Sequence, residues 1–242
     1  MRVAFYNQMF GLNGRSFFSS VFGHLAVHTG ILGDFVERKV NLKKTVEIVK
    51  RSGADIVGVC EILQGQEEEL ERGLRKAGFR YFHFGEGHRT KLRKRYIKTM
   101  LASKIKCHKE YVEKEPIENH LGGGGGFIEG YFPSLKLSVL ALHLGIKKEL
   151  REKQLRFIEK DIKKRENMIV MGDFNSCSEE VVDYFNGFNL VSDKVKTCNL
   201  TPVMRFFHFE DDDHIFVRGL KKKRIGFLEG RSDHRLIYVD LE

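Results

Sequence analysis

Carboxylate and amide side chains follow an apolar run in residues 167–175 (NMIVMGDFN), and these groups could bind a cation and a phosphate. The run is apolar up to Gly172 and then presents Asp173 and Asn175. Residues two apart on a strand point to the same face. If the strand continues to residue 175, the two side chains project together from its end. The alternative is a plain Asp/Asn turn.

Other apolar runs also end or begin with polar groups: Asn7, Glu61, His143, Asp213 with His214, and Ser232-Asp233-His234. A buried carboxylate such as Glu61 is costly unless a cation or an Arg pairs with it. Asp beside His suits metal binding and proton transfer near neutral pH. Each group alone has an ordinary alternative, such as a solvated acidic turn at 210–213 or a hydrogen-bonded His. Their recurrence indicates a hydrolytic metal site, in which oxygen ligands favour Mg²⁺ or Mn²⁺ over zinc.

The elements that must position these groups are short strands that alternate with amphipathic helices. β-Branched and aromatic runs predict strands at 2–7, 55–61, 98–104, 126–132, 136–144, 167–175, 214–220 and 235–242. Apolar periodicity and terminal glycines predict helices at 40–53, 66–78 and 147–165. Many strands with intervening helices predict a layered α/β fold. Because there is no fixed-period repeat or linker-like segment, we expect a single domain over residues 1–242.

The composition is that of a soluble globular protein, with 242 residues, a formal net charge of +9 and a pI near 9.3. A basic chain tends to bind polyanions such as nucleic acid, nucleotides or anionic headgroups. A solvated basic surface is the alternative. The four cysteines form no Cys-x-x-Cys pair, which argues against a disulfide framework or a zinc ribbon. The first residues lack the apolar core of a signal peptide, so we expect a cytoplasmic protein.

Two stretches lie outside this pattern. Residues 15–36 are unusually apolar but fall short of a membrane span. A lid, an amphipathic surface helix and core packing are all open, and we favour packing over contact with a membrane surface. His24 and His28 are spaced like zinc ligands, but no Glu follows the first His, so we expect no ligand role. Gly122–Gly126 lacks a following Lys-Ser/Thr, which predicts a flexible turn rather than a phosphate-binding loop.

The ordered set of motifs resembles the endonuclease/exonuclease/phosphatase superfamily. The matching residues span the chain: Asn7, Glu61, His143-Leu144, Gly172-Asp173-Phe174-Asn175, Asp213-His214-Ile215-Phe216 and Ser232-Asp233-His234. The superfamily includes pancreatic-type deoxyribonucleases, apurinic-site endonucleases, neutral sphingomyelinases, inositol polyphosphate 5-phosphatases and deadenylases. The resemblance implies a four-layered α/β/β/α sandwich, with two packed mixed β-sheets flanked by helices and the site at one edge of the sheets.

The resemblance also implies a metal site. Glu61 would be the main ligand, Asn7 would help hold the metal and phosphate region, and Asp233 would shape the site close to the ion. The expected cofactor is Mg²⁺, with Mn²⁺ as the alternative.

Five further residues would act on the phosphate if the resemblance holds. Asp173 would orient or deprotonate the attacking water, and Asn175 would hydrogen-bond the phosphoryl oxygens. Asp213 would orient His234, which would contact the scissile phosphate. His143 would be a further donor to the phosphate.

Three functions compete on the sequence alone. The first is a nuclease or nucleic-acid phosphodiesterase, favoured by the net charge and by the basic stretches 88–98 and 221–224. Within the superfamily, His143-Leu144 followed by Arg151 and Gln154 resembles the deoxyribonuclease, sphingomyelinase and tyrosyl-DNA phosphodiesterase side. The second is a phosphatase or phosphodiesterase acting on a small-molecule or lipid-headgroup phosphate, favoured by the apolar stretch 15–36. The third is a binding or scaffold protein that has lost catalysis, because fold does not fix function. The expected partner is a phosphate-ester substrate, with nucleic acid favoured.

Overall fold

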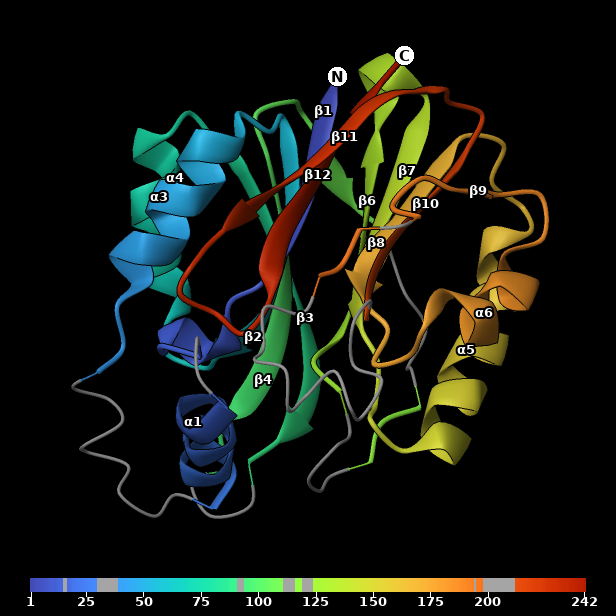
Figure 1. The fold of residues 1–242 in the computed structure, drawn as a ribbon. Helices are drawn as coiled ribbons and strands as arrows, with labels where there is room; N and C mark the ends of the chain where they lie inside the picture. The colour runs from blue at the N-terminus through green and yellow to red at the C-terminus, as the bar shows by residue number, and fades with distance from the viewer. Residues whose placement is uncertain are drawn as a thin grey trace.

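Two six-stranded β-sheets pack face to face, and helices cover their outer faces (Figure 1). This computed structural model describes residues 1–14, 17–29, 39–90, 94–110, 116–118, 124–193, 195–197 and 212–242. The arrangement is the four-layered α/β/β/α sandwich that the resemblance implies.

The first sheet brings the two ends of the chain together. Its strand order is β11 (Lys222–Glu229), β12 (Arg235–Leu241), β1 (Arg2–Asn7), β2 (Ile56–Leu63), β4 (Tyr96–Ser103) and β3 (Tyr81–Arg89). β1 and β2 are parallel, and the other neighbours in this sheet are antiparallel. The carboxyl ends of β1 and β2 therefore lie at the same edge as the start of β12.

The second sheet also contains one parallel pair of strands next to an antiparallel strand. Its order is β5 (His108–Lys109), β6 (Gly126–Phe132), β7 (Leu137–His143), β8 (Met168–Asp173), β10 (Asp213–Arg218) and β9 (Asn189–Leu190). β7 and β8 are parallel, whereas β10 is antiparallel to β8. The carboxyl ends of β7 and β8 thus meet the start of β10.

Apolar helix faces form the outer layers. α3 (Leu42–Ser52) and α4 (Glu67–Lys76) cover the first sheet, and α5 (Lys148–Ile162) and the short α6 (Ser178–Val181) cover the second. α1 (Phe17–Thr29) lies at one end of the first sheet, after the 3-10 turn η1 (Met9–Gly11). Two further 3-10 turns are η2 (Pro133–Leu135) and η3 (Val182–Phe185). None of the described helices is long and apolar enough to span a membrane.

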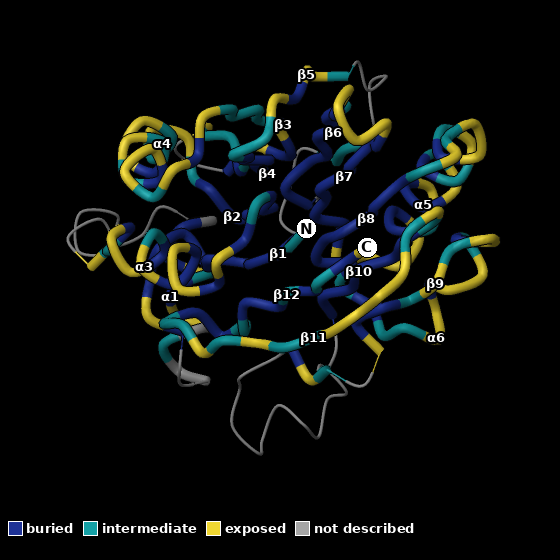
Figure 2. Tube along the Cα trace, turned by 90° about the horizontal axis from the view of Figure 1, so that it is seen from above, coloured by how far each residue is buried: buried dark blue, intermediate teal, exposed yellow. Residues whose placement is uncertain are grey.

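The main core fills the space between the sheets, where the buried residues of Figure 2 are concentrated. Phe5 and Met171 pack there from opposite sheets. A β-carbon at Gly58 would lie 2.9 Å from Phe5 and 3.1 Å from the β-carbon of Ala141. Glycine at this position therefore lets the two sheets approach closely.

The structure confirms a strand in each of the eight predicted runs and a helix in each of the three predicted segments. Two long strands escaped prediction, β3 and β11. Both lie at sheet edges, and most of their residues are half-buried or exposed. They therefore lack the continuous apolar run that identifies a central strand.

Candidate active site

Six polar residues from both sheets meet at one edge of the sandwich. Asn7, Glu61, His143 and Asp173 lie at or near the carboxyl ends of β1, β2, β7 and β8. Asp213 begins β10, and His234 immediately precedes β12. Asp173 is the register partner of both His143 and Asp213. The alternation of parallel and antiparallel strands thus gathers residues from the whole length of the chain.

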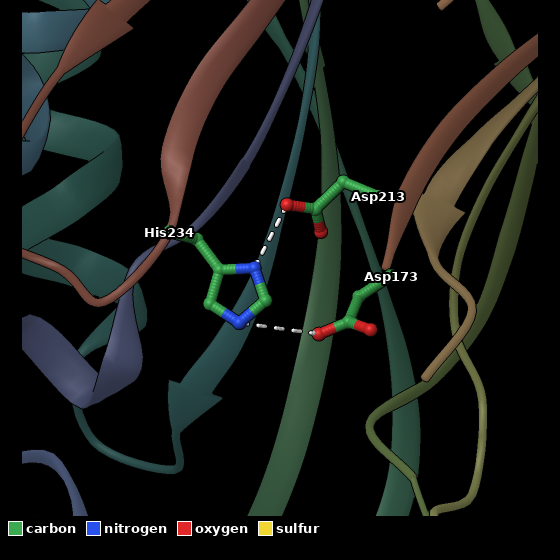
Figure 3. Close-up of side chains that lie close together, drawn as sticks. All are labelled: Asp173, Asp213 and His234. Atoms are coloured by element: carbon green, nitrogen blue, oxygen red, sulfur yellow. Dashed lines mark hydrogen bonds and ion pairs between the residues drawn. The ribbon is translucent and has the colours of Figure 1, made fainter. Parts of the chain in front are cut away.

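His234 lies between two carboxylates (Figure 3). Its Nδ1 is 2.8 Å from Asp213 Oδ2, and its Nε2 is 3.9 Å from Asp173 Oδ2. Burial lowers the pKa of His234, but Asp213, Asp233 and Asp173 outweigh it and raise the pKa well above the ordinary value. These carboxylates therefore favour the charged form of the ring, which lies close to Asp173.

Asp173 is fixed by two hydrogen bonds. Asn7 Nδ2 donates to Asp173 Oδ2 over 2.8 Å, and the Asn175 N–H donates to Asp173 Oδ1 over 2.8 Å. Asn7 is itself held, because its Oδ1 accepts the Met9 N–H over 2.9 Å. The carboxylate is thus oriented while Oδ2 still faces the imidazoles of His234 and His143.

The expectation that Asp173 and Asn175 share one strand face is wrong. β8 ends at Asp173, and Asn175 adopts a left-handed backbone with φ of 48°. The Asp173 side chain closes a turn on the Asn175 N–H, which is the alternative that the residue types allow. The Asn175 side chain donates from Nδ2 to the carbonyl of Leu144 over 2.9 Å. It is therefore anchored to the loop that follows β7.

Glu61 occupies a strained position in β2. The pairing of β2 with β4 shifts register between Val59 and Ile62, and Glu61 has φ of 55°. A bulge of this kind redirects a side chain and is common beside active sites. Glu61 Oε1 lies 3.9 Å from His143 Nε2. Glu61 Oε2 is buried and has no hydrogen-bond partner among the described residues.

Asp233 is positioned by its neighbour Ser232. Ser232 Oγ donates to Asp233 Oδ1 over 3.0 Å and accepts the His234 N–H over 3.1 Å. Asp233 Oδ2 lies 3.6 Å from Nε2 of His24 on α1. The Ser-Asp-His sequence therefore supplies a buried carboxylate and an imidazole, and the Ser hydroxyl bonds the Asp233 carboxylate and the His234 backbone N–H.

Helix α1 carries His24, whose place at the site the sequence does not predict. His24 Nε2 lies 4.0 Å from Glu61 Oε2 as well as 3.6 Å from Asp233 Oδ2. Burial lowers the pKa of His24, but Glu61 and Asp233 raise it to about 9. From its spacing to His28 we expected no ligand role for His24, but the structure places its imidazole beside Glu61 and Asp233. The partners come from β2 and from the loop before β12, not from α1, so no motif within the helix could indicate them. The His28 side chain lies outside the described residues.

The glycine run also departs from expectation. Gly122 and Gly123 lie outside the described residues, but Gly124 and Gly125 lie against His143. The Gly125 N–H donates to the His143 carbonyl over 3.0 Å, and a β-carbon at Gly125 would lie 2.5 Å from His143 Nδ1. Close packing beside the imidazole, rather than flexibility alone, accounts for glycine here.

The chemistry of the donors fits a divalent cation. The buried Oε2 of Glu61 lacks a hydrogen-bond partner, and Asp233 Oδ2 faces the same imidazole. Oxygen donors of this kind suit Mg²⁺ or Mn²⁺. Among the described residues, the ligand atoms that all lie within 4.8 Å of one another are those of Asp173, Asp213 and His234, and Glu61 and Asp233 are not in this group. In that group, the short contact between His234 and Asp213 is an ordinary hydrogen bond. We therefore favour binding of the ion at Glu61 and Asp233 over binding between Asp173, Asp213 and His234.

Other predicted features contact residues outside this cluster. Gln154 Oε1 accepts the Gly145 N–H over 2.8 Å, and Arg151 donates to the Ile146 carbonyl over 2.8 Å. These two side chains hold the loop after β7.

The basic stretch 221–224 includes the start of β11, where Lys222 pairs with Leu241. That position is the opposite end of the sheet from the site.

The fold and the site define a class of phosphoesterase, and comparison with known families agrees. The chain matches the model of the Endonuclease/Exonuclease/phosphatase family over residues 21–234. It therefore belongs to this family, whose members are hydrolytic phosphoesterases. A search of curated proteins finds no match.

Solved structures share the fold at low sequence identity. An endonuclease/exonuclease/phosphatase from Beutenbergia cavernae DSM 12333 matches with a TM-score of 0.73 and 15% identity, over 100% of this chain and 71% of that chain. D. rerio TDP2, humanized by 14 mutations, matches with a TM-score of 0.63 and 15% identity, over 100% and 98%. The mannosyl-6-phosphatase Bt3783 from Bacteroides thetaiotaomicron VPI-5482 matches with a TM-score of 0.63 and 17% identity, over 100% and 99%. At such low sequence identity, these matches show a shared fold alone.

Proposed function

We propose that this protein is a Mg²⁺-dependent phosphodiesterase that hydrolyses phosphodiester bonds in nucleic acid. The observation that carries the proposal is the meeting of Glu61, Asp173 and His234 at one edge of the two sheets. Distant segments have no packing reason to deliver two buried carboxylates and a charged imidazole to one small volume. Hydrolysis at phosphorus requires such groups.

Asp173 would act on the attacking water. Asn7 and the Asn175 N–H fix the direction of its carboxylate. Oδ2 retains acceptor capacity toward the space between His143 and His234, so it can orient a water and accept its proton. When bound, the divalent cation supplies positive charge for the nonbridging oxygens.

The two imidazoles would stabilise the charge that develops on the phosphate. Asp213 accepts from His234 Nδ1, so Nε2–H points at the reaction space. A charged donor there neutralises a nonbridging oxygen in the transition state. His143 Nε2, which lies 3.8 Å from Asp173 Oδ2, provides a second donor from the opposite side.

The β3–β4 hairpin supports a nucleic-acid substrate. Ile97 and Lys98 of β4 pair with Leu63 and Ile62, so the hairpin lies at the same end of the sheet as Glu61. Arg89 and Lys94 are exposed there, and the Arg89 guanidinium lies 4.1 Å from the centre of the Tyr96 ring. Cationic and aromatic groups beside the site are what a nucleic-acid strand binds.

A matched pair of variants tests this substrate class. Replacing Arg89 and Lys94 by Gln removes charge near the site, whereas Lys222→Ala with Lys223→Ala removes the same charge at the opposite end. We expect only the first pair to raise KM for a fluorogenic single-stranded oligonucleotide and to flatten its salt dependence, by about 0.7 in log–log slope per lost phosphate contact. Both pairs should hydrolyse bis(p-nitrophenyl) phosphate like the unchanged protein. Equal effects of the two pairs on oligonucleotide cleavage would contradict the proposal.

A magnesium titration tests catalysis itself. Purified protein should hydrolyse the diester only with the added ion, and Asp173→Ala should abolish this activity. No Mg²⁺-dependent turnover of the oligonucleotide, of bis(p-nitrophenyl) phosphate or of a phosphomonoester would favour a binding protein that has lost catalysis.

One observation favours the alternative, a small-molecule or lipid-headgroup phosphate. Val21, Phe22 and Leu25 of α1 are 47%, 46% and 53% exposed, on the helix that carries His24 to the site. Exposed apolar side chains on this helix could contact the apolar part of such a substrate. Efficient turnover of a phosphomonoester that competing DNA does not inhibit would select this alternative.

A further inference from the structure

We propose that His24 of helix α1 is a ligand of the catalytic cation, together with Glu61 and Asp233. The inference rests on the proposed function, because it concerns the ion of that site. It adds a nitrogen donor from a segment that no motif of the chain assigns to the metal.

Helix α1 is packed so that His24 faces the site. Ala26 and Val27 are buried against Met9, Phe10 and Ile97. A β-carbon at Gly23 would lie 2.8 Å from the terminal methyl of Met9, so the helix approaches η1 closely. The docked helix therefore presents His24 to the site from a fixed backbone.

The Phe10 ring restricts the orientation of the His24 imidazole. The Phe10 ring meets the imidazole edge to face, with centroids 5.5 Å apart. Phe10 itself is held in η1 by a left-handed backbone with φ of 56° and is fully buried. The imidazole is thus directed at the two carboxylates before any ion binds, which lowers the entropic cost of coordination.

The distances from His24 to each of the two carboxylates suit an ion shared with that carboxylate. Two ligands of an octahedral cation at about 2.1 Å lie about 3.0 Å apart when adjacent and about 4.2 Å apart when opposite. The separations of His24 Nε2 from Asp233 Oδ2 and Glu61 Oε2, 3.6 Å and 4.0 Å, fall between these limits. Because Glu61 Oε2 has no hydrogen-bond partner among the described residues, it is available to a cation.

A nitrogen donor changes which metal the site prefers. Imidazole binds Mn²⁺ and later transition ions better than Mg²⁺, which strongly prefers oxygen. Coordination needs the neutral ring, so its proton leaves to solvent as the ion enters. We therefore expect His24 to favour Mn²⁺ over Mg²⁺, while Glu61 supports both.

The test measures metal binding by the full chain, without substrate. Calorimetry with MnCl₂ and MgCl₂ should show that His24→Ala weakens Mn²⁺ binding at least ~10-fold and Mg²⁺ binding much less. Glu61→Gln should weaken both. Leu25→Ala, an exposed change on the same helix, should alter neither. His24→Gln provides a second variant if circular dichroism shows that the Ala variant is misfolded.

Electron spin echo spectroscopy of bound Mn²⁺ identifies the nitrogen. The ¹⁴N modulation should be present in the unchanged protein and in His143→Ala, and absent in His24→Ala. Unchanged Mn²⁺ affinity and ¹⁴N signal in both His24 variants would overturn the inference while leaving the proposed function intact. Failure of the unchanged protein to bind either ion would instead overturn the metal-dependent function together with this inference.

Discussion

Nδ1 of His234 hydrogen-bonds Asp213 Oδ2 over 2.8 Å, and this bond turns Nε2 toward Asp173. The two carboxylates come from adjacent strands of the second sheet, whereas His234 comes from the first sheet. The pair therefore bridges the two halves of the sandwich at the site.

Asp213→Asn should lower kcat for bis(p-nitrophenyl) phosphate about 10²-fold, because the amide cannot stabilise a charged imidazole. The loss should not add to that of His234→Ala: the double variant should be about as slow as His234→Ala alone, since Asp213 acts through the ring. Multiplicative losses in the double variant would show that Asp213 acts independently of His234.

Asp173→Ala and His234→Ala should each lose at least ~10²-fold in rate while folding normally, because they remove the group that orients the water and a donor to the phosphate. Steady-state kinetics measures the loss, and circular dichroism checks the fold. Turnover close to that of the unchanged protein in either variant would refute its assigned role.

Gly125→Ala should slow hydrolysis by displacing His143, because the new β-carbon would lie 2.5 Å from Nδ1. We expect kcat to fall toward the value of His143→Ala. Gly130→Ala is the matched control: its β-carbon would lie 2.7 Å from Leu101, and Gly130 lies within strand β6, whereas Gly125 immediately precedes that strand. The control should lower thermal stability and leave kcat unchanged. If both variants changed kcat alike, displacement of His143 would not explain the loss.

Glu129 should make stability depend on pH. Burial raises the pKa of Glu129 to about 7, although Arg165, 3.2 Å away, opposes the shift. Because the folded pKa exceeds the unfolded value of 4.5, the folded state binds the proton more tightly. The resulting stabilisation is complete below the unfolded pKa and is lost as the pH rises through about 7.

Urea unfolding of the unchanged protein and Glu129→Gln at pH 4.5 and pH 8 measures this effect. We expect the unchanged protein to lose up to about 3 kcal/mol more than the variant over that interval, at about 1.4 kcal/mol per pKa unit. Equal losses in the two proteins would show that Glu129 keeps its ordinary pKa when folded.

Much of the fold could be predicted because central strands and amphipathic helices have local signatures. β1 and β8 are continuous apolar runs, and the outer helices show apolar periodicity. The edge strands β3 and β11 lack such a signature. Their partners, β4 and β12, supply the hydrogen bonds that hold them extended, so tertiary pairing decides their structure.

The residue types of the site were determined by the sequence alone, since Asp, Glu, Asn and His at the ends of apolar runs are costly to bury without a function. Only the tertiary structure decided how they lie: the bulge at Glu61, the turn at Asn175, the packing of Gly125 on His143, and the approach of His24 to Glu61 and Asp233. These relationships depend on distances between segments far apart in the chain. Local spacing cannot encode them, because they arise only when the two sheets and helix α1 pack together.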